Sequence, residues 1–213
     1  MSAHPHERQP VLTLGPPPAQ ARLGAILVHG RGASADDILG LAHELAIPDI
    51  AYLAPQAAGH SWYPYSFLAP LAQNEPGLSS ALRLIEGLVD QLGREGLPAE
   101  RVVLMGFSQG ACLTLEFAAR HSRRYAAIAA FSGGVIGPAG TPRDYAGSFA
   151  GTPVFLGCSD SDPHIPVARV RESADVFRRM GATVDERIYP RMGHTINADE
   201  LAAVGRLLAP PIS

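Results

Sequence analysis

The sequence predicts a single α/β domain in which a mainly parallel sheet is covered by helices on both faces. Short apolar runs alternate along the chain with segments of helical periodicity, which is the pattern of repeated strand–helix–strand units. A length of 213 residues suits one domain with a full hydrophobic core. The chain shows no internal repeat and no shift in composition that would mark a second domain.

The predicted strands are short apolar runs, as expected of strands that are buried on both faces. They lie at 24–28, 50–54, 101–106, 126–131, 153–157 and 182–189. The predicted helices lie at 35–46, 80–95, 109–121, from about 166, and after Asn197. Ser34 is a suitable N-cap for the first helix. Asn197, with Glu200 three residues later, comes close to a capping box for the last helix.

Two segments have no regular period. Residues 1–20 are polar and rich in proline, which predicts a flexible N-terminal arm ahead of a domain over residues 21–213. Residues 55–78 predict a long loop. No other insertion is long enough to form a lid domain, so we expect an open and shallow site.

Composition excludes several classes of protein. The net charge is −3 and there is no basic run, so we expect no nucleic-acid partner. No apolar run approaches the roughly 20 residues that cross a bilayer, so we expect no stable membrane insertion. With only Cys112 and Cys158 and no signal peptide, the chain is expected to be cytoplasmic. The sequence leaves a homodimer open and predicts no cofactor.

One turn carries the pattern of a nucleophile. The run from Val102 to Gly110 passes from an apolar strand through Gly-x-Ser-x-Gly into a helix. This turn lifts a serine off the sheet edge in α/β hydrolases, so the chain is expected to have the α/β-hydrolase fold with Ser108 as nucleophile. The alternative is that Ser108 only caps the helix. A cap would not need a glycine on each side, and Ala111 occupies the position of a capping-box partner.

A serine hydroxyl needs a base to take its proton, and in this fold the chain order is serine, acid, histidine. Three histidines follow Ser108. His121 lies about three turns down the same helix, and His164 is only two residues from the expected acid. His194 follows the last strand in a loop that can reach the sheet edge, so it is the predicted base.

The acid is expected in the loop after the strand at 153–157, where Asp160 and Asp162 both qualify by position. Asp162 is preferred because a proline turn follows it and would fix its carboxylate. Asp160 would then cap a turn. Together with His164 these residues could suggest a metal site, but ligands crowded on one loop rarely complete one, so no metal is predicted.

Acyl transfer also needs two backbone N–H donors for the developing oxyanion. Gln109 follows the nucleophile and supplies one predicted donor, and Arg31 in the glycine-rich loop after the first apolar strand supplies the other. The Arg31 side chain is expected either to meet an acidic substrate or to lie in solvent. His29 is expected to have a structural role at the strand end.

These segments resemble the phospholipase/carboxylesterase branch of the α/β hydrolases, which also contains acyl-protein thioesterases. The resemblance covers about residues 22–209 and rests on four segments: Leu27–Gly32, Gly106–Gly110, Asp160–Pro166 and Gly193–His194. It implies a triad of Ser108, Asp162 and His194, with oxyanion donors on Arg31 and Gln109. It also favours Asp162 over Asp160.

The loop at 55–78 departs from the thioesterase pattern. Relatives carry tryptophan, an aromatic residue and an acid there, whereas this chain has Pro64 in the place of the acid. The resemblance therefore implies the fold and not protein depalmitoylation. Trp62, Tyr63, Tyr65 and Phe67 are expected to form an aromatic wall that binds substrate, with Trp62 foremost, although these rings could instead fasten the loop to the body. Cys112, one helical turn after Ser108, is expected to be a core residue, with a place under the pocket as the alternative.

Taken together, the residues predict a serine carboxylesterase that hydrolyses small to medium carboxylic esters through an acyl-enzyme. One alternative is an acyl thioesterase or lysophospholipase that uses the same triad. An alternative from another class is a catalytically silent α/β hydrolase that binds a small molecule. In each case the expected partner is a small molecule, an ester if the protein is an enzyme.

Overall fold

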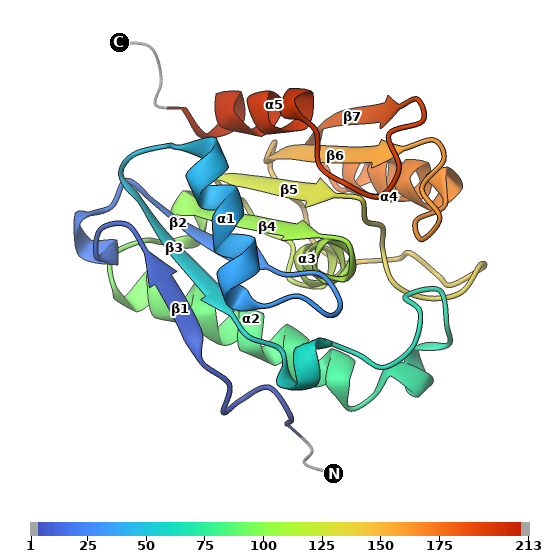
Figure 1. Cartoon of the computed structure of the whole chain (residues 1–213), viewed down its shortest axis with the longest axis horizontal. Helices are drawn as coiled ribbons and strands as arrows, with labels where there is room; N and C mark the ends of the chain where they lie inside the picture. The colour runs from blue at the N-terminus through green and yellow to red at the C-terminus, as the bar shows by residue number, and fades with distance from the viewer. Residues whose placement is uncertain (1–3, 210–213) are drawn as a thin grey trace.

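The computed structural model describes residues 4–209, which form one seven-stranded sheet (Figure 1). The strand order is β1-β3-β2-β4-β5-β6-β7, and every neighbouring pair is parallel except β1 with β3. The strands are β1 (Val11–Leu14), β2 (Leu23–Val28), β3 (Ile50–Pro55), β4 (Val102–Phe107), β5 (Ala127–Phe131), β6 (Pro153–Ser159) and β7 (Thr183–Tyr189). The predicted mainly parallel sheet is confirmed.

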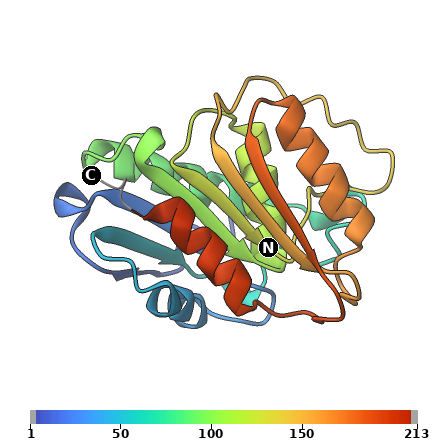
Figure 2. The same cartoon turned by 90° about the horizontal axis from the view of Figure 1, so that it is seen from above.

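Helices cover both faces of the sheet (Figures 1 and 2). On one face lie α1 (Ala35–Leu45) and α5 (Ala198–Leu208). On the other lie α2 (Gly77–Arg94), α3 (Gln109–Arg120) and α4 (Val167–Arg179). Within the described part of the chain, no lid domain covers the carboxyl edge of the sheet, and no helix is long and apolar enough to span a bilayer.

The alternation of side chains along each strand divides the core into two halves. In β2, Ile26 and Val28 contact the core beneath α2 and α3, whereas Ala25 and Leu27 contact the core beneath α1 and α5. Every residue of β2 is buried. A parallel strand between two helical layers has no solvent face, which is why the sequence shows continuous apolar runs instead of alternation.

Both predicted helix caps are confirmed. The Ser34 side chain accepts from the backbone N–H of Asp37, and the Asp37 carboxylate accepts from the backbone N–H of Ser34. Asn197 and Glu200 form the same reciprocal pair at the start of α5. These pairs satisfy N–H groups that a helix start leaves unbonded, so they fix where α1 and α5 begin.

The structure differs from the sequence prediction at the N-terminus. Residues 1–20 were expected to be a flexible arm, yet Val11–Leu14 form edge strand β1 and pair with β3. Further upstream, the His6 ring is buried and lies 3.0 Å from the carbonyl oxygen of Trp62 and 3.0 Å from the backbone nitrogen of Ala58. Residues 1–3 lie outside the described part. The segment from His6 onward is therefore bound to the domain.

Glu200 has an unusual position for a carboxylate. It is fully buried at the start of α5, and burial raises its pKa to about 7. One oxygen, Oε2, accepts from the backbone N–H of Asn197, while Oε1 has no partner among the described residues. Burying an ion with an unpaired oxygen is costly, so the proton stays on the folded protein at a pH where the unfolded chain has lost it.

We therefore expect the Glu200→Gln variant to be more stable than the wild type at pH 8, by about 3 kcal/mol if the whole pKa difference is recovered. Between the unfolded pKa and about 7 the wild type loses stability as pH rises, because only the unfolded state releases the proton. Below the unfolded pKa both states are protonated and the two proteins should match. Urea unfolding at pH 4 and pH 8 measures this, with exposed Glu100→Gln as the control. An equal difference at both pH values would contradict it.

Candidate active site

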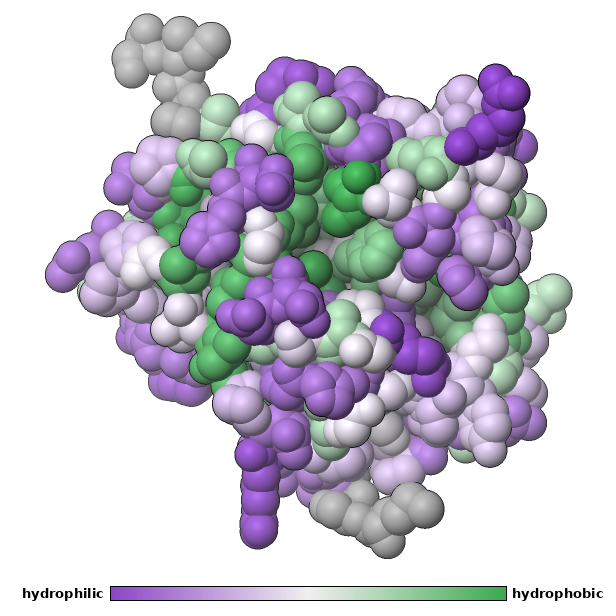
Figure 3. All heavy atoms as spheres, viewed as in Figure 1, coloured by the Kyte–Doolittle hydropathy of each residue, from purple (hydrophilic) through white to green (hydrophobic). Residues whose placement is uncertain are grey.

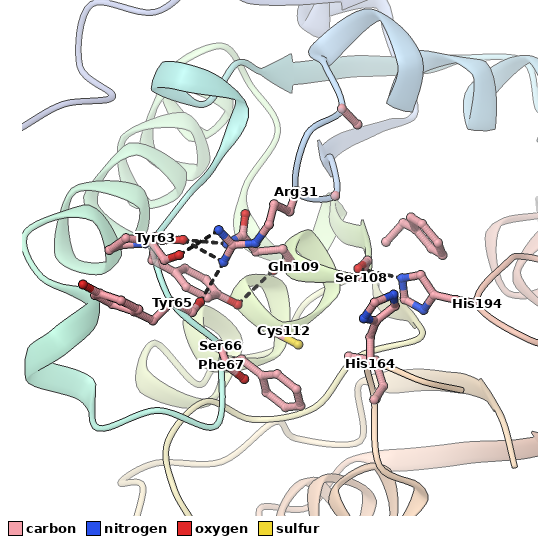
Figure 4. A pocket seen from close by; sticks show the side chains of 15 residues that line it. Arg31, Tyr63, Tyr65, Ser66, Phe67, Ser108, Gln109, Cys112, His164 and His194 are labelled. Carbon is pink, nitrogen blue, oxygen red and sulfur yellow. Dashed lines mark hydrogen bonds between the residues drawn. The ribbon is translucent and has the colours of Figure 1, made fainter. Parts of the chain in front are cut away.

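A pocket of about 640 Å³ opens at the carboxyl edge of the parallel strands (Figure 4). Its residues come from the loops that follow β2, β3, β4, β6 and β7. They are Gly30, Arg31, Ala33, Tyr63, Pro64, Tyr65, Ser66, Phe67, Phe107, Ser108, Gln109, Cys112, His164, Ile165 and His194. In open parallel sheets this edge is where ligands bind, because the loops of several strands meet there.

Ser108 occupies the turn between β4 and α3 in a strained backbone conformation, with φ 57° and ψ −120°. A non-glycine residue rarely adopts such angles, and strain of this kind persists where the surrounding structure imposes it. A side chain on Gly106 would meet the backbone of Gly110 at 2.5 Å, and one on Gly110 would meet the carbonyl oxygen of Val28 at 2.0 Å. Both glycines are therefore required for the tight turn that presents Ser108.

The structure brings Ser108, His194 and Asp162 into one hydrogen-bonded chain (Figure 4). The Ser108 Oγ lies 2.8 Å from Nε2 of His194, and Nδ1 of His194 lies 2.7 Å from Oδ2 of Asp162. The Ser108 hydroxyl makes no capping bond to α3, so the helix-cap alternative does not account for it. A hydroxyl, an imidazole and a carboxylate in this order form a chain that can remove a proton from the hydroxyl.

The Asp162 carboxylate is held on both sides. Its Oδ1 accepts from the backbone N–H groups of His164 and Ile165, at 2.8 and 3.0 Å. Burial alone would raise the pKa of Asp162, but the bonds from His194 and from these two N–H groups outweigh it, so the pKa lies below its usual value. Asp162 therefore stays ionised and can orient the imidazole.

Asp160 serves the loop that carries the imidazole. Its Oδ1 accepts from the backbone N–H of Arg191 at 2.7 Å. Ser159 adds a second tie, because its hydroxyl accepts from the backbone N–H of Gly193 at 3.1 Å. Both bonds fasten the segment just before His194 to the end of β6. The turn role expected for Asp160 is thus observed, and the residue does not contact His194 through any bond of the described chain.

The expected oxyanion donors belong to residues that line the same pocket as Ser108. Arg31 and Gln109 both line the pocket, and neither backbone N–H donates to an acceptor in the described part of the chain. Gln109 is the first residue of α3, whose N-terminus carries partial positive charge. The side chain of Gln109 also fixes the opposite wall, because it accepts from the backbone N–H of Trp62 and donates to the carbonyl oxygen of Tyr63.

The Arg31 residue is exposed, as one of the two sequence expectations had it, but its guanidinium also has a structural role that the sequence did not suggest. It donates four hydrogen bonds of 2.7 to 2.9 Å to the loop after β3, as Figure 4 shows in part. The acceptors are Ser61 Oγ and the carbonyl oxygens of Tyr63, Pro64 and Tyr65. Arg31 therefore joins the predicted oxyanion loop to the aromatic loop.

The prediction of an aromatic wall is only partly right. Trp62 is fully buried outside the pocket lining, and its indole N–H donates to the carbonyl oxygen of His29 at 2.8 Å. The prediction that Trp62 binds substrate is therefore wrong, because the ring fastens the loop to the end of β2. Phe67 lines the pocket and is buried, whereas Tyr65 is 58% exposed and its ring points away from Ser108 in Figure 4.

Four further residues contribute to the pocket. Tyr63 and Cys112 form part of its lining, and burial raises the pKa of the Cys112 thiol to about 12, so the thiol is unreactive at neutral pH. His164 lies edge-on to His194 with 4.8 Å between ring centroids, and Phe107 lies 5.0 Å from the same ring. Phe107 is the second residue of Gly-x-Ser-x-Gly, and that position could have been identified from the motif alone.

Two other histidines that the sequence analysis considered have structural partners. His121 stacks on Phe117 and pairs with Glu86, far from Ser108 along α3. His29 is buried, with Nε2 accepting from the backbone N–H of Ala57, in agreement with its expected structural role. Within residues 4–209, no three His, Cys, Asp or Glu side chains converge in an arrangement that could hold a metal ion.

A strained strand–serine–helix turn at the carboxyl edge of such a sheet, with an imidazole and a carboxylate in reach, defines the α/β-hydrolase class of serine hydrolases. Comparison with known families is more specific. The model of the phospholipase/carboxylesterase family matches residues 16–210. The chain belongs to this family.

Solved structures and a curated relative agree with this assignment. The structure of a phospholipase/carboxylesterase from Dyadobacter fermentans DSM 18053 is 43% identical, covers 98% of this chain and 99% of its own, and superposes with a TM-score of 0.93. That of esterase PE8 is 27% identical, with coverages of 94% and 96% and a TM-score of 0.77. Acyl-protein thioesterase 1 of Debaryomyces hansenii is 25% identical over 65% of this chain, and the match spans 61% of that protein's length.

Proposed function

We propose that this protein is a serine carboxylesterase that hydrolyses small to medium carboxylic esters through an acyl-enzyme. The observation that carries the proposal is the bonded chain from Ser108 through His194 to Asp162. The family assignment supports hydrolase chemistry. The presence of Arg31 and Gln109 in the pocket lining, with backbone N–H groups that donate to no acceptor in the described part of the chain, supports acyl transfer in particular.

In the first half of the proposed reaction, Ser108 Oγ attacks the ester carbonyl carbon while Nε2 of His194 takes the hydroxyl proton. The carbonyl oxygen becomes negative between the N–H groups of Arg31 and Gln109. As the tetrahedral intermediate collapses, His194 passes its proton to the leaving alcohol and the acyl group remains on Ser108. Water then repeats the sequence, attacking the acyl-enzyme with His194 as base and releasing the acid and the free serine.

The nature of the pocket supports esters of modest size. Phe67, Tyr63 and Ile165 offer apolar contact, and no lid domain closes over the described site. The same machinery would also cleave thioesters, and a curated relative is called acyl-protein thioesterase 1. Pro64 occupies the position where the thioesterase pattern carries an acid, which supports oxygen esters over acylated proteins. Both cysteines are free and buried, which supports our proposal of a reducing, cytoplasmic location.

A labelling experiment and a substrate panel test this proposal. A fluorophosphonate probe should modify Ser108, identified by peptide mass spectrometry, and should not modify the Ser108→Ala protein. Initial rates on matched butanoate oxygen esters, butanoate thioesters and lysophospholipids should give the highest kcat/KM for the oxygen esters. An unlabelled Ser108 would support a silent binding protein instead, and a preference for thioesters or lysophospholipids would replace the carboxylesterase proposal.

A further inference from the structure

A second hollow lies beside the active-site pocket, on the face of the sheet that α1 and α5 cover. It encloses about 480 Å³, and Figure 3 shows apolar side chains gathered in the hollow between these two helices. Its lining is mostly apolar. The residues are His29, Gly30, Ala33, Asp37, Ile38, Leu41, Glu44, Phe107, Ile196 and Leu201. None of them is a residue that we assign to the proton-transfer chain.

The two hollows are neighbours. Gly30, Ala33 and Phe107 line both of them, so only these residues need separate a molecule in one hollow from a molecule in the other. That ring lies 5.0 Å from the His194 ring, and Ile196 follows His194 by two residues. The second hollow therefore begins on the His194 side of Ser108, and we call it the α1/α5 groove.

The proposed chemistry assigns different parts of the substrate to the two hollows. The leaving oxygen must receive its proton from Nε2 of His194, so the group attached to that oxygen leaves past this ring. The acyl group stays on Ser108 and extends into the first pocket, among Phe67, Cys112 and Ile165. We propose that the α1/α5 groove binds the leaving-group half of the substrate, an alkyl alcohol that carries a positive charge at its far end.

The positive charge proposed for the far end of the alcohol is inferred from the acidic residues on α1. Asp37 and Glu44 line the groove seven residues apart, about 10 Å along the helix, with Ile38 and Leu41 between them. No arginine is among the lining residues, and the chain contains no lysine. Hydrogen bonds from the Ser34 hydroxyl and backbone N–H hold the pKa of Asp37 below its usual value, so its carboxylate is charged. The groove is thus apolar along its length and negative at its margin.

This inference rests on the proposed function. A set of esters distinguishes a failure of the inference from a failure of the proposed function. All members share the butanoyl group and differ in the alcohol. The first is the methyl ester. The other three carry a hexyl chain that ends in a cationic trimethylammonio group, in a neutral tert-butyl group of the same shape, or in an anionic sulfonate. A second set keeps the methyl alcohol and lengthens the acyl chain to octanoyl. We expect the cationic ester to exceed the neutral isostere in kcat/KM by about two- to fivefold, the range of a solvent-exposed ion pair, and the sulfonate to be lowest.

Four variants at two residues of the groove address it directly. Leu201→Trp fills it and should lower the kcat/KM of the neutral isostere relative to the methyl ester about tenfold, equivalent to lost contact with about two methylene groups. Leu201→Ala should lower the same ratio by less. Because it adds no bulk, it tests the same contact even if Leu201→Trp fails to fold. Glu44→Gln should reduce the preference for the cation, the Asp37 carboxylate retaining the remainder, and Glu44→Arg should shift the preference toward the sulfonate.

Matched controls lie away from the groove. Leu12→Trp on β1 and Asp90→Asn on α2 should leave all of these ratios unchanged, and thermal unfolding checks that each variant is folded. The inference is overturned if the wild type has the same kcat/KM for the methyl ester as for the neutral and cationic hexyl esters. It is also overturned if Leu201→Trp changes the octanoyl ratio instead, or if the sulfonate is preferred. Loss of every Ser108-dependent activity would instead overturn the proposed function, and the inference with it.

Discussion

The Ser108→Ala variant is expected to lose about 10⁶-fold in kcat toward a p-nitrophenyl ester, the loss typical of removing a serine nucleophile that works with a histidine. Without Oγ no acyl-enzyme can form, and His194 Nε2 loses the partner that lies 2.8 Å away. A residual rate above that of buffer should remain, because the N–H groups of Arg31 and Gln109 can still bind a carbonyl oxygen that water attacks.

The measurement is the steady-state rate of p-nitrophenol release, with protein purified free of other esterases. Ser79→Ala on α2, outside the pocket lining, is the matched control and should retain wild-type kinetics. If the alanine variant kept the wild-type rate, Ser108 would not be the nucleophile and the whole assignment would be abandoned.

The Asp162→Asn variant is expected to lose about 10⁴-fold in kcat, as when a triad aspartate becomes an amide. The Asp162 carboxylate accepts from Nδ1 of His194 at 2.7 Å, which leaves Nε2 unprotonated and able to accept from Ser108. An asparagine can turn its amide N–H toward Nδ1, and the proton then resides on Nε2, where it blocks the base. Substrate binding should change little, so the loss should appear in kcat and not in KM.

Asp160→Asn is the matched control in the same loop. Among residues 4–209, its carboxylate accepts one bond, from the backbone N–H of Arg191, and an amide oxygen can accept that bond as well. We expect kcat within a few-fold of the wild type. A loss in this variant equal to that in Asp162→Asn would mean that loop geometry, and not the charge beside His194, controls the rate.

Much of this site could be predicted because each part of it has a local signature. The elbow at Ser108 needs a strand, two glycines and a helix within a dozen residues, and all of these are adjacent in the sequence. The order rule then restricted the acid and the base to the ends of β6 and β7. Capping boxes at Ser34 and Asn197 are likewise visible within four residues, and the structure contains both.

The parts that were not predicted depend on contacts between distant segments. Strand β1 has only four residues, all at least partly exposed, and it is held by pairing with β3 some forty residues later. The burial of Trp62 depends on the carbonyl oxygen of His29, thirty-three residues upstream. The four bonds of Arg31 are a further example, because their acceptors are mostly backbone carbonyls, which leave no trace in the side-chain pattern.

The position of His6 has a consequence for any shortened or fused form of this protein. Its imidazole bonds the carbonyl oxygen of Trp62, and the Trp62 indole in turn bonds the carbonyl oxygen of His29, next to the loop that offers the Arg31 N–H. Removal of the first six residues would leave buried polar atoms, such as the carbonyl oxygen of Trp62, without a hydrogen-bond partner. Each such atom lowers the free energy of unfolding by about 1–3 kcal/mol. His6 thus ties the start of the described chain to the loop that carries Trp62, and we expect a fusion joined upstream to need His6 for full stability.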